Sequence, residues 1–417
     1  MNSGDYVRLR LAREELECTL LESYDSSVVL VKLASGYNIG IPKEHILGSE
    51  VIRSAHVEKK SVPLVQKKGL PCIGLVVTGG TIASSIDSKK GGVSPLTSVE
   101  DFSRFYPQLF ERVNVKRLEV PFTKFSENMT PEDWITLAGA VQEMLNDSTI
   151  NGVIVTHGTD TLHYTAAALS FFLRELSKPV VLTYSQRSID RGSSDATLNL
   201  ACAARVALSD CAEVVLVGHA NLDDDYCYAL RGTKVRKLHS SRRDAFKSVN
   251  IGPLARVWPN TIEFLEPFKA RHTGKTELDV LFNDKVALVK YYPGQSSDII
   301  DYYRMHGYKG LVIEVLGLGN LPAGESLISW VPALKKAIRE GMLVCAAAQT
   351  IYGRLNPFVY STGRELEKTG IIFLEDMLAE TAFVKLGWVL GHRGWKEKAR
   401  EKMLENVAGE LHPLITA

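Results

Sequence analysis

The chain has 417 residues, of which 45% are apolar and 23% charged, and its formal net charge at pH 7 is +1. This composition is that of an ordinary soluble globular protein, and the length allows two or three domains. A net charge this close to zero excludes a whole-molecule field that draws the chain to nucleic acid or membrane, so any RNA contact has to come from a local patch or a partner.

The sequence predicts neither secretion, nor a membrane span, nor a metal centre. Charged residues occupy the N-terminal stretch where a signal peptide has its apolar region, and no apolar stretch reaches the ~20 residues of a membrane span. The six cysteines form no C-x-x-C pair and no cluster with histidine, which is typical of reduced core residues in a cytoplasmic protein. They are Cys18, Cys72, Cys202, Cys211, Cys227 and Cys345.

Short runs of alternating apolar and polar residues open the chain, with Asp, Ser and Gly in the turns between them. The runs are 6–12, 15–23, 27–34 and 37–42. Their length favours strands over helices, and four or five strands in about 50 residues predict a small SH3-like or Sm-like β-barrel domain at 1–60. Such barrels often bind partners or RNA. The alternative is a docking or spacer module with no ligand of its own.

The alternation stops in 49–70, where Lys, Ser and Pro accumulate. This composition is typical of a linker. We place the linker at 61–70, after the predicted barrel, and begin the second domain at residue 71.

From residue 72 the pattern changes to strands that alternate with helical stretches. The strands are predicted near 72–78, 115–120, 151–156, 180–184, 213–218 and 251–257. The clearest helix start is Thr130-Pro131, an N-cap hydroxyl followed by proline, with acids in the first turn. Strand, helix and strand in this order predict a flavodoxin-like parallel sheet in a domain at 71–270. A smaller α/β domain is predicted at 285–417, with its last helices at 376–390 and 393–411.

Two β-branched apolar runs, in 76–84 and 153–169, each stop at a glycine turn that presents a hydroxyl or carboxylate. Thr81, Thr159 and Asp160 therefore lie at the carboxyl ends of predicted strands, where open α/β sheets bind ligands. The glycines leave backbone N–H groups free, and those of Gly80 and Thr159 are expected to donate to an oxyanion. Two hydroxyls and a carboxylate predict acyl transfer with a threonine nucleophile. The alternative for Thr81 is an N-cap hydroxyl.

A threonine hydroxyl is a weak nucleophile without a base. Lys237, in the hydroxyl-rich segment 232–246, is the candidate for a proton relay with Thr159 and Asp160. The alternative for Lys237 is a structural ion pair.

The cationic residues around Lys237 predict either a phosphate-binding surface or a rim that faces an anionic substrate or a neighbouring protein. These neighbours are Arg231, Lys234, Arg236, Arg242, Arg243 and Lys247.

Three blocks resemble the signatures of the L-asparaginase/glutaminase family. They are TGGTIA at 78–83, HGTDT at 157–161 and a K-x-H-S-S segment at 237–241. The resemblance runs from about residue 70 to about residue 390 and implies a two-domain asparaginase-like α/β fold. It implies that Thr81, Thr159, Asp160 and Lys237 are the catalytic residues, and it leaves open which threonine attacks first.

The same resemblance implies that Ser126, Glu127 and Asp160 bind the α-carboxylate and α-ammonium groups of the substrate, together with Gly80. An acid at position 127 suits an ammonium group because the hydrogen bond is charge-assisted. The alternative for Ser126 is turn chemistry.

The segment 85–98 is predicted to be a lid over the substrate. Many relatives carry a catalytic tyrosine there, whereas this sequence has no tyrosine between Thr81 and Tyr106. The group that activates Thr81 is therefore left open.

The segments 125–134, 185–200 and 231–246 are similar to one branch of the family, the D-type subunits of the archaeal glutamyl-tRNA(Gln) amidotransferase. This similarity implies a glutaminase-type amidohydrolase that releases ammonia from glutamine or asparagine and itself binds no cofactor. It implies a partner, the E-type subunit of the same amidotransferase, which binds ATP and magnesium and converts Glu-tRNA(Gln) to Gln-tRNA(Gln), so that tRNA(Gln) is met through the complex. It also implies a homodimer, with Asn320 as the candidate contributor to the partner's site.

Two alternatives stay open. One is a free-standing cytoplasmic L-asparaginase with an appended barrel, and the other is an RNA-binding or scaffolding protein with an idle amidase site. Among the remaining residues, His157 is predicted to pack and hydrogen-bond, and Asp190 and Arg191 to form a rim ion pair or a contact to a second copy. The charged helix at 393–411 is predicted to be a solvated face.

Overall fold

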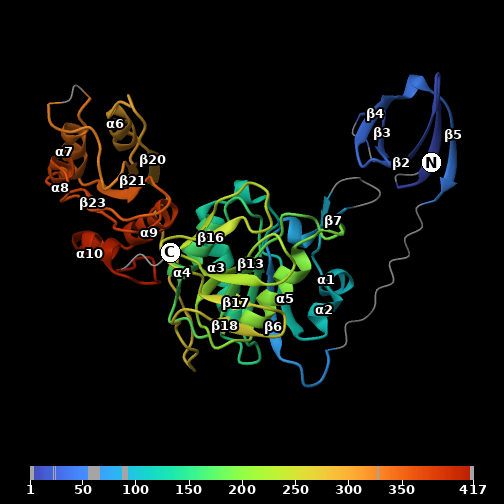
Figure 1. Cartoon of the computed structure of the whole chain (residues 1–417), viewed down its shortest axis with the longest axis horizontal. Helices are drawn as coiled ribbons and strands as arrows, with labels where there is room; N and C mark the ends of the chain where they lie inside the picture. The colour runs from blue at the N-terminus through green and yellow to red at the C-terminus, as the bar shows by residue number, and fades with distance from the viewer. Residues whose placement is uncertain are drawn as a thin grey trace.

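The computed structural model describes residues 4–21, 23, 25–54, 66–86, 93–325 and 328–413. A small N-terminal sheet and a C-terminal α/β domain stand at opposite ends of the long axis, with a larger α/β domain between them (Figure 1). No helix among the described residues is long and apolar enough to cross a membrane.

The N-terminal sheet is antiparallel, with the strand order β4-β3-β2-β1-β5. Its strands are β1 (Tyr6–Leu11), β2 (Glu15–Leu20), β3 (Val28–Leu33), β4 (Asn38–Pro42) and β5 (Ile46–Arg53). The alternation of the sequence turns one set of side chains inward, and these form a small separate core of Val7, Leu9, Cys18, Leu20, Val31 and Ile41.

The prediction of a closed barrel is wrong for this sheet. The short helix η1 (Lys43–His45) carries the chain from β4 to the far side of β1, where β5 pairs, so β4 and β5 are opposite edges. Alternation identifies the strands and which side chains they bury, but it does not determine whether the two edge strands hydrogen-bond to each other.

Strand β5 continues to Arg53, into the stretch 49–70 where the sequence loses its alternation. Most β5 side chains are exposed on both faces of the strand, so the sequence there carries no period-two pattern. The first half of the predicted linker, residues 61–65, lies outside the described residues.

The central domain contains an eight-stranded sheet with the order β18-β17-β14-β13-β12-β10-β6-β9. The strands are β6 (Cys72–Val77), β9 (Asn114–Glu119), β10 (Val153–Thr156), β12 (Val180–Thr183), β13 (Val214–His219), β14 (Cys227–Arg231), β17 (Ala255–Val257) and β18 (Ile262–Phe264). Pairing from β9 to β13 is parallel, as predicted, whereas β14, β17 and β18 are antiparallel. Only residues 220–226 join β13 to β14, which is too short for a parallel crossover.

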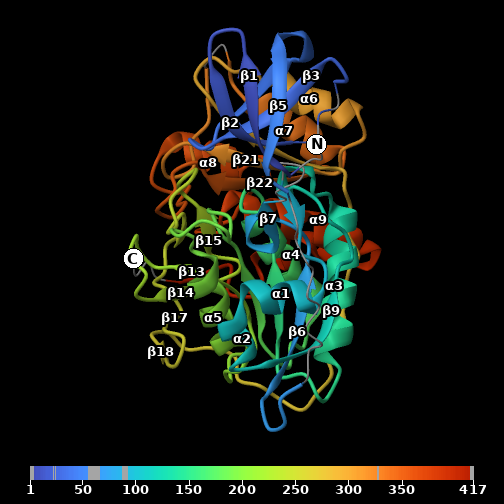
Figure 2. The same ribbon diagram turned by 90° about the vertical axis from the view of Figure 1, so that its right-hand side faces the viewer.

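Helices cover both faces of this sheet. One face packs against α3 (Pro131–Leu145) and α4 (Leu162–Phe172), and the other against α1 (Val99–Phe105), α2 (Pro107–Phe110) and α5 (Ala196–Ala207). In Figure 2, α1 and α2 lie in front of the sheet and α4 lies behind it. The predicted start of α3 is confirmed, because the Thr130 side chain and Asp133 form a capping box and Pro131 is the first helical residue.

The C-terminal domain has a parallel sheet with the order β20-β21-β22-β23. Its elements are β20 (Val286–Lys290), α6 (Asp298–Met305), β21 (Gly310–Val315), α7 (Val331–Arg339), β22 (Leu343–Ala348), α8 (Ser361–Glu367), β23 (Ile372–Phe373), α9 (Ala379–Gly391), η4 (Arg393–Lys398) and α10 (Ala399–Leu404). Helix α9 packs against both this sheet and α4, so one hydrophobic core spans the two domains.

The single helix predicted at 393–411 is wrong. The helical segments η4 and α10 end at Leu404, and residues 405–413 form an irregular C-terminal segment. Glu410 in this segment is fully buried and accepts hydrogen bonds from the amides of Val407 and Ala408. Those amides therefore bond to a carboxylate instead of continuing a helix.

Two buried ion pairs secure this part of the chain. Lys385 Nζ lies 2.5 Å from Glu410 Oε1, and Lys234 Nζ lies 2.5 Å from Asp376 Oδ2, with all four side chains inaccessible to solvent. The His412 amide donates to the second carboxylate oxygen of Asp376 over 2.9 Å. The C-terminal segment is thereby tied to the C-terminal domain, whose Asp376 is in turn paired with Lys234 of the central domain.

We predict that Lys385→Met lowers the free energy of unfolding by about 3–5 kcal/mol, because it leaves the Glu410 carboxylate buried without its cation. Urea unfolding followed by circular dichroism measures the change. Lys336→Met is the matched control: Lys336 lies 3.4 Å from Asp301 at the surface, and its loss is expected to cost less than about 1 kcal/mol. Equal, small effects of the two substitutions would contradict the prediction.

Candidate active site

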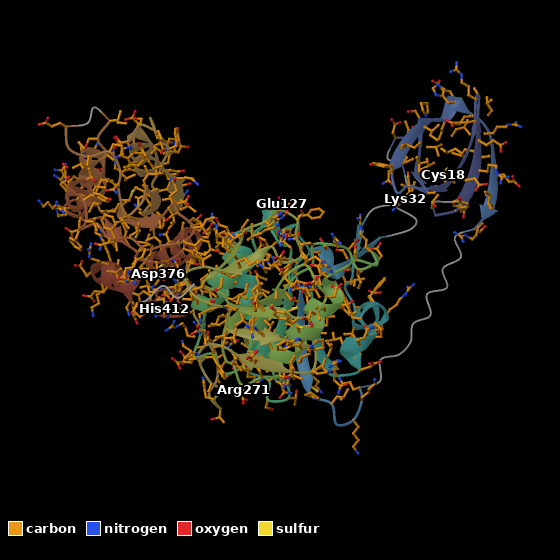
Figure 3. The ribbon with its side chains drawn as sticks, viewed as in Figure 1. Cys18, Lys32, Glu127, Arg271, Asp376 and His412 are labelled. Atoms are coloured by element: carbon orange, nitrogen blue, oxygen red, sulfur yellow. The ribbon has the colours of Figure 1, made fainter. Side chains whose placement is uncertain are left out.

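The candidate site is built on two adjacent parallel strands. Thr156, the last residue of β10, is in register with Val77, the last residue of β6. The chain then leaves β6 through a glycine turn into the short helix η2 (Thr81–Ala83) and leaves β10 through His157 and Gly158 toward α4. The two turns therefore lie side by side at the carboxyl edge of the sheet, as the sequence predicts. Glu127, labelled in Figure 3, marks this edge, and Arg271 marks the opposite one.

The two turns approach each other so closely that only glycine fits between them. A Cβ on Gly80 would lie 2.6 Å from the Gly158 nitrogen and 2.7 Å from the His157 carbonyl carbon, and Gly80 has a φ of 82°. A Cβ on Gly158 would lie 2.8 Å from Ser126 Oγ. Both glycines therefore allow backbone contacts that a side chain would prevent.

Lys237 brings a cation to the second turn. It ends β15 (Val235–Lys237), which pairs with β16 (Phe246–Ser248), and its Nζ lies 2.8 Å from Thr159 Oγ1 and 2.8 Å from Asp160 Oδ1. The Lys237 side chain is 11% exposed and that of Asp160 is 63% exposed. The structure therefore brings together Thr159, Asp160 and Lys237, with the amine sheltered and the carboxylate open to solvent.

The neighbouring residue Arg236 faces the other way and anchors the same strand. Its guanidinium lies 2.9 Å from Glu380 Oε1 in the first turn of α9. Arg236 thus ties β15 to the C-terminal domain while Lys237 contacts the turn at Thr159.

Thr81 lies in the first turn, and its hydroxyl makes no hydrogen bond within the described part of the chain. The N-cap of η2 is Gly80, so the alternative of Thr81 as a capping hydroxyl is wrong. Two other side chains hold the turn: Ser84 Oγ donates to the Gly80 carbonyl over 2.8 Å, and Tyr106 Oη donates to the Ile82 carbonyl over 2.5 Å.

Tyr106 does not replace the missing lid tyrosine as a base. It is 1% exposed, and burial raises the pKa of its phenol far above the ordinary value. Its hydroxyl is already committed to the Ile82 carbonyl. Part of the predicted lid, residues 87–92, lies outside the described residues.

The residues predicted to bind substrate lie beside the second turn. Ser126 is buried in the short helix η3 (Ser126–Asn128), where its Oγ accepts from the Asp160 amide over 3.1 Å and its carbonyl accepts from Thr161 Oγ1 over 2.6 Å. Glu127 is exposed at the same place. Ser126 therefore orders the turn, and the carboxylates of Glu127 and Asp160 face solvent.

His157 is buried and hydrogen-bonded, which confirms its prediction as a packing residue. Its Nδ1 lies 2.7 Å from the Gly158 carbonyl oxygen and its Nε2 lies 2.9 Å from Thr165 Oγ1. Trp134 Nε1 donates to Thr165 Oγ1 over 3.1 Å. Neither Thr165 nor Trp134 was among the residues predicted from the sequence. The indole N–H of Trp134 could have pointed to this contact, because a tryptophan on the buried face of a helix needs a hydrogen-bond acceptor.

The basic run around Lys237 does not form an open cationic surface. Its members pair with carboxylates: Arg231 with Glu213, Lys234 with Asp376, Arg236 with Glu380, Arg242 and Lys247 with Asp244, and Arg243 with Asp224. The phosphate-binding alternative is therefore not supported. Asp190 and Arg191 form no ion pair with each other in the described structure, so that part of the prediction is wrong.

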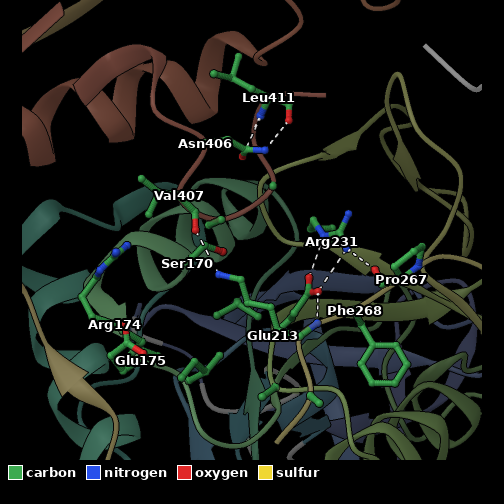
Figure 4. Close-up of a pocket in the computed structure, with 18 of the residues that line it drawn as sticks. Ser170, Arg174, Glu175, Glu213, Arg231, Pro267, Phe268, Asn406, Val407 and Leu411 are labelled. Atoms are coloured by element: carbon green, nitrogen blue, oxygen red, sulfur yellow. Dashed lines mark hydrogen bonds and ion pairs between the residues drawn. The ribbon is translucent and has the colours of Figure 1, made fainter. Parts of the chain in front are cut away.

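A separate cavity of about 570 Å³ lies at the edge of the central sheet opposite to the two glycine turns (Figure 4). It is bounded by the end of α4, the Glu213–Arg231 ion pair, and the C-terminal segment at Asn406 to Pro413. None of the residues predicted to be catalytic or to bind the amide substrate lines it. Groups of three or more side chains able to hold a metal ion are absent from the described residues.

Family models match the whole arrangement. "Asparaginase, N-terminal" matches residues 72–269, "Glutaminase/Asparaginase C-terminal domain" matches 285–404, and "GatD N-terminal domain" matches 1–52. The chain is 48% identical to the D-type subunit of glutamyl-tRNA(Gln) amidotransferase from Pyrococcus abyssi, over 99% of this chain and 95% of that protein. It is 41% identical to the protein of the same name from Methanococcus maripaludis, over 100% of this chain and 99% of the relative. The chain belongs to this family of D-type amidotransferase subunits.

Solved structures agree with this assignment for the two α/β domains. The thermostable L-asparaginase from Thermococcus kodakarensis superimposes with a TM-score of 0.72 at 30% identity, covering 82% of this chain and 99% of that one. L-asparaginase I from Vibrio cholerae gives 0.69 at 27% identity, with the same coverage. The asparaginase-like two-domain fold and the resemblance to the D-type branch are confirmed, and the chain is an amidotransferase subunit with an asparaginase-like catalytic domain.

We predict that Gly80→Ala lowers the free energy of unfolding by about 1–3 kcal/mol, because the new Cβ meets backbone atoms at a positive φ. Gly139→Ala is the control: Gly139 lies inside α3 with open space around it, and the substitution is expected to stabilise the chain by about 0.5–1 kcal/mol. Denaturant unfolding of both variants tests the pair. The prediction fails if Gly80→Ala is as stable as the unsubstituted chain.

Proposed function

We propose that this chain is the glutaminase-type component of a glutamyl-tRNA(Gln) amidotransferase. It hydrolyses the carboxamide of glutamine, or of asparagine, and the ammonia is used by the E-type partner to convert Glu-tRNA(Gln) to Gln-tRNA(Gln). ATP and magnesium bind to that partner, and this chain binds no cofactor. The observation that carries the proposal is the position of Lys237 Nζ, 2.8 Å from both Thr159 Oγ1 and Asp160 Oδ1, beside the turn that presents Thr81.

In the proposed mechanism Thr81 Oγ1 attacks the carboxamide carbon. The oxyanion accepts hydrogen bonds from the backbone amides of Gly80 and Thr159, neither of which donates to another group in the described structure. The proton of the Thr81 hydroxyl passes to the carboxamide nitrogen, the carbon–nitrogen bond breaks so that ammonia leaves, and an ester forms at Thr81.

Water then cleaves this ester, which releases glutamate or aspartate and restores the Thr81 hydroxyl. Lys237, when deprotonated, takes a proton from Thr159 or from that water and returns it to the Thr81 oxygen as the ester bond breaks, and Asp160 holds the amine in place. The 11% exposure of Lys237 supports this role, since a sheltered amine exchanges protons with its neighbours more than with bulk water.

The substrate is held by Asp160 and Glu127, with Ser126 and Gly80 beside them. The two exposed carboxylates suit the α-ammonium group through charge-assisted hydrogen bonds. Ser126 acts by ordering the Asp160 amide, and its hydroxyl hydrogen stays available for the α-carboxylate.

A homodimer fits an apolar surface on the C-terminal domain. Large side chains that are 36–65% exposed follow the carboxyl ends of its parallel strands: Tyr292, Leu316, Leu318, Ile351, Tyr352, Phe358, Val359 and Tyr360. Exposed apolar side chains gathered at one end of a sheet are typical of an interaction site. Asn320 follows β21 in the same region and accepts a hydrogen bond from Thr362. It is the residue that we assign to the partner copy's site.

We expect the purified chain to release little ammonia from glutamine when alone and more when the E-type partner and Glu-tRNA(Gln) are added. The same assay, coupled ammonia detection, is made with asparagine, and the two rates of ammonia release distinguish an amidotransferase component from an L-asparaginase. Strong hydrolysis of asparagine without any partner would instead identify a free-standing L-asparaginase with an additional N-terminal sheet. No ammonia release under any of these conditions would leave a scaffolding role.

Lys237→Ala is expected to lower kcat for ammonia release by about 100-fold or more, because the relay loses its proton acceptor. Lys247→Ala is the control from the same hairpin: its amine pairs with Asp244, away from Thr159, and kcat should stay near that of the unsubstituted chain. Full activity of the Lys237 variant would rule out the relay.

A further inference from the structure

A chain of hydrogen bonds connects the interior of the central domain to the second glycine turn. It runs from Trp134 Nε1 to Thr165 Oγ1 over 3.1 Å, from Thr165 to His157 Nε2 over 2.9 Å, and from His157 Nδ1 to the Gly158 carbonyl oxygen over 2.7 Å. The three side chains are 5%, 0% and 1% exposed. Helices α3 and α4 supply the first two, and the last side chain belongs to the turn itself.

The directions of the hydrogen bonds in this series are determined by its two ends and by the neutral imidazole of His157 between them. An indole N–H only donates, and a carbonyl oxygen only accepts. Thr165 Oγ1 therefore accepts from Trp134 and donates its own proton to His157 Nε2. His157 must in turn carry its proton on Nδ1, in order to donate to the Gly158 carbonyl.

His157 is neutral in this arrangement. Burial lowers the pKa of His157 to about 4, so at pH 5 to 8 only one ring nitrogen carries hydrogen. That nitrogen is Nδ1, which faces the Gly158 carbonyl, and Nε2 is left to accept from Thr165 Oγ1. The direction of these hydrogen bonds therefore does not change between pH 5 and 8, and the imidazole takes no part in proton transfer.

The last bond acts on the peptide that joins Gly158 to Thr159. The described chain has no cis peptide bonds, so the Thr159 N–H points away from the Gly158 carbonyl and from the imidazole. Fixing the carbonyl fixes the direction of this N–H. A hydrogen bond to the carbonyl also polarises the amide and strengthens the N–H as a donor.

The geometry points to Thr165 and Trp134 as positioning residues, which act through His157 to aim the Thr159 N–H at the oxyanion. This inference rests on the proposed function, because it needs the Thr159 amide to be an oxyanion donor. The same hydrogen bonds link the second glycine turn to the segment with Ser126 and Glu127, since α3, which carries Trp134, directly follows that segment.

Thr165→Val tests the inference, because it removes the hydroxyl and keeps the shape of the side chain. We expect kcat for ammonia release, measured on the full chain with the E-type partner and Glu-tRNA(Gln), to fall at least tenfold while KM for glutamine stays within about twofold, since the oxyanion forms only in the transition state. Thr165→Ser restores the hydroxyl and should recover most of kcat. Thr136→Val, which removes an exposed hydroxyl bonded to the Glu132 carbonyl on α3, is the control and should leave kcat unchanged.

A purely structural role predicts a different result, in which Thr165→Val and Thr165→Ser lose activity equally, or kcat falls only in proportion to the unfolded fraction. Either result, or an unchanged kcat in Thr165→Val, overturns the inference. Trp134→Phe removes the other donor and gives a second test if Thr165→Val does not fold, with kcat again expected to fall and KM to hold.

Nitrogen-15 NMR of the histidines separates this inference from the proposed function. In the unsubstituted chain His157 should stay neutral with Nδ1 protonated down to about pH 5, and Trp134→Phe or Thr165→Val should give mixed tautomers. A His157 that is protonated on Nε2 overturns the inference regardless of activity. The NMR result can hold although the unsubstituted protein releases no ammonia. In that case the proposed function fails, and with it the role of these hydrogen bonds in aiming an oxyanion donor.

Discussion

The contact between two glycine turns is the constraint on which the rest of the site depends. Parallel pairing brings the ends of β6 and β10 into register, and the backbone of Gly80 then lies against that of Gly158 without room for a side chain. This contact sets how far Thr81 stands from Thr159. Everything else at the site is arranged around that spacing, from the amine of Lys237 on one side to the η3 segment with Ser126 on the other.

The site draws on both α/β domains, although its reactive side chains come from one. Lys237 reaches Thr159 from a two-stranded hairpin, and the residue before it is fixed to α9 of the C-terminal domain by the Arg236–Glu380 ion pair. A shift of α9 relative to the central sheet would therefore be transmitted along β15 to the amine of Lys237. The shared hydrophobic core resists such a shift, because α9 is packed against α4 and the small sheet together.

Much of the site could be predicted from the sequence because its signals are local. A run of β-branched residues, a glycine turn and a hydroxyl place Thr81 and Thr159 at strand ends without any knowledge of distant contacts. What the sequence did not reveal depends on long-range packing. Tyr106 bonds to the Ile82 carbonyl, and Trp134 meets His157 only through Thr165 on another helix. The errors in the fold have a related origin: β5 is exposed on both faces and has no pattern, and the buried Glu410 interrupts a sequence with helical character.

The C-terminal segment has a consequence for how this protein is made. Glu410 neutralises Lys385, the Ala408 carbonyl accepts from Thr233, and the His412 amide bonds to the carboxylate that neutralises Lys234. During translation most of the two α/β domains emerges from the ribosome before these partners, so Lys385, which becomes inaccessible to water, is made before the carboxylate that neutralises it. The junction between the domains can therefore be completed only after residues 405–413 have been synthesised, and a message truncated before the codon for Glu410 would leave Lys385 without its carboxylate.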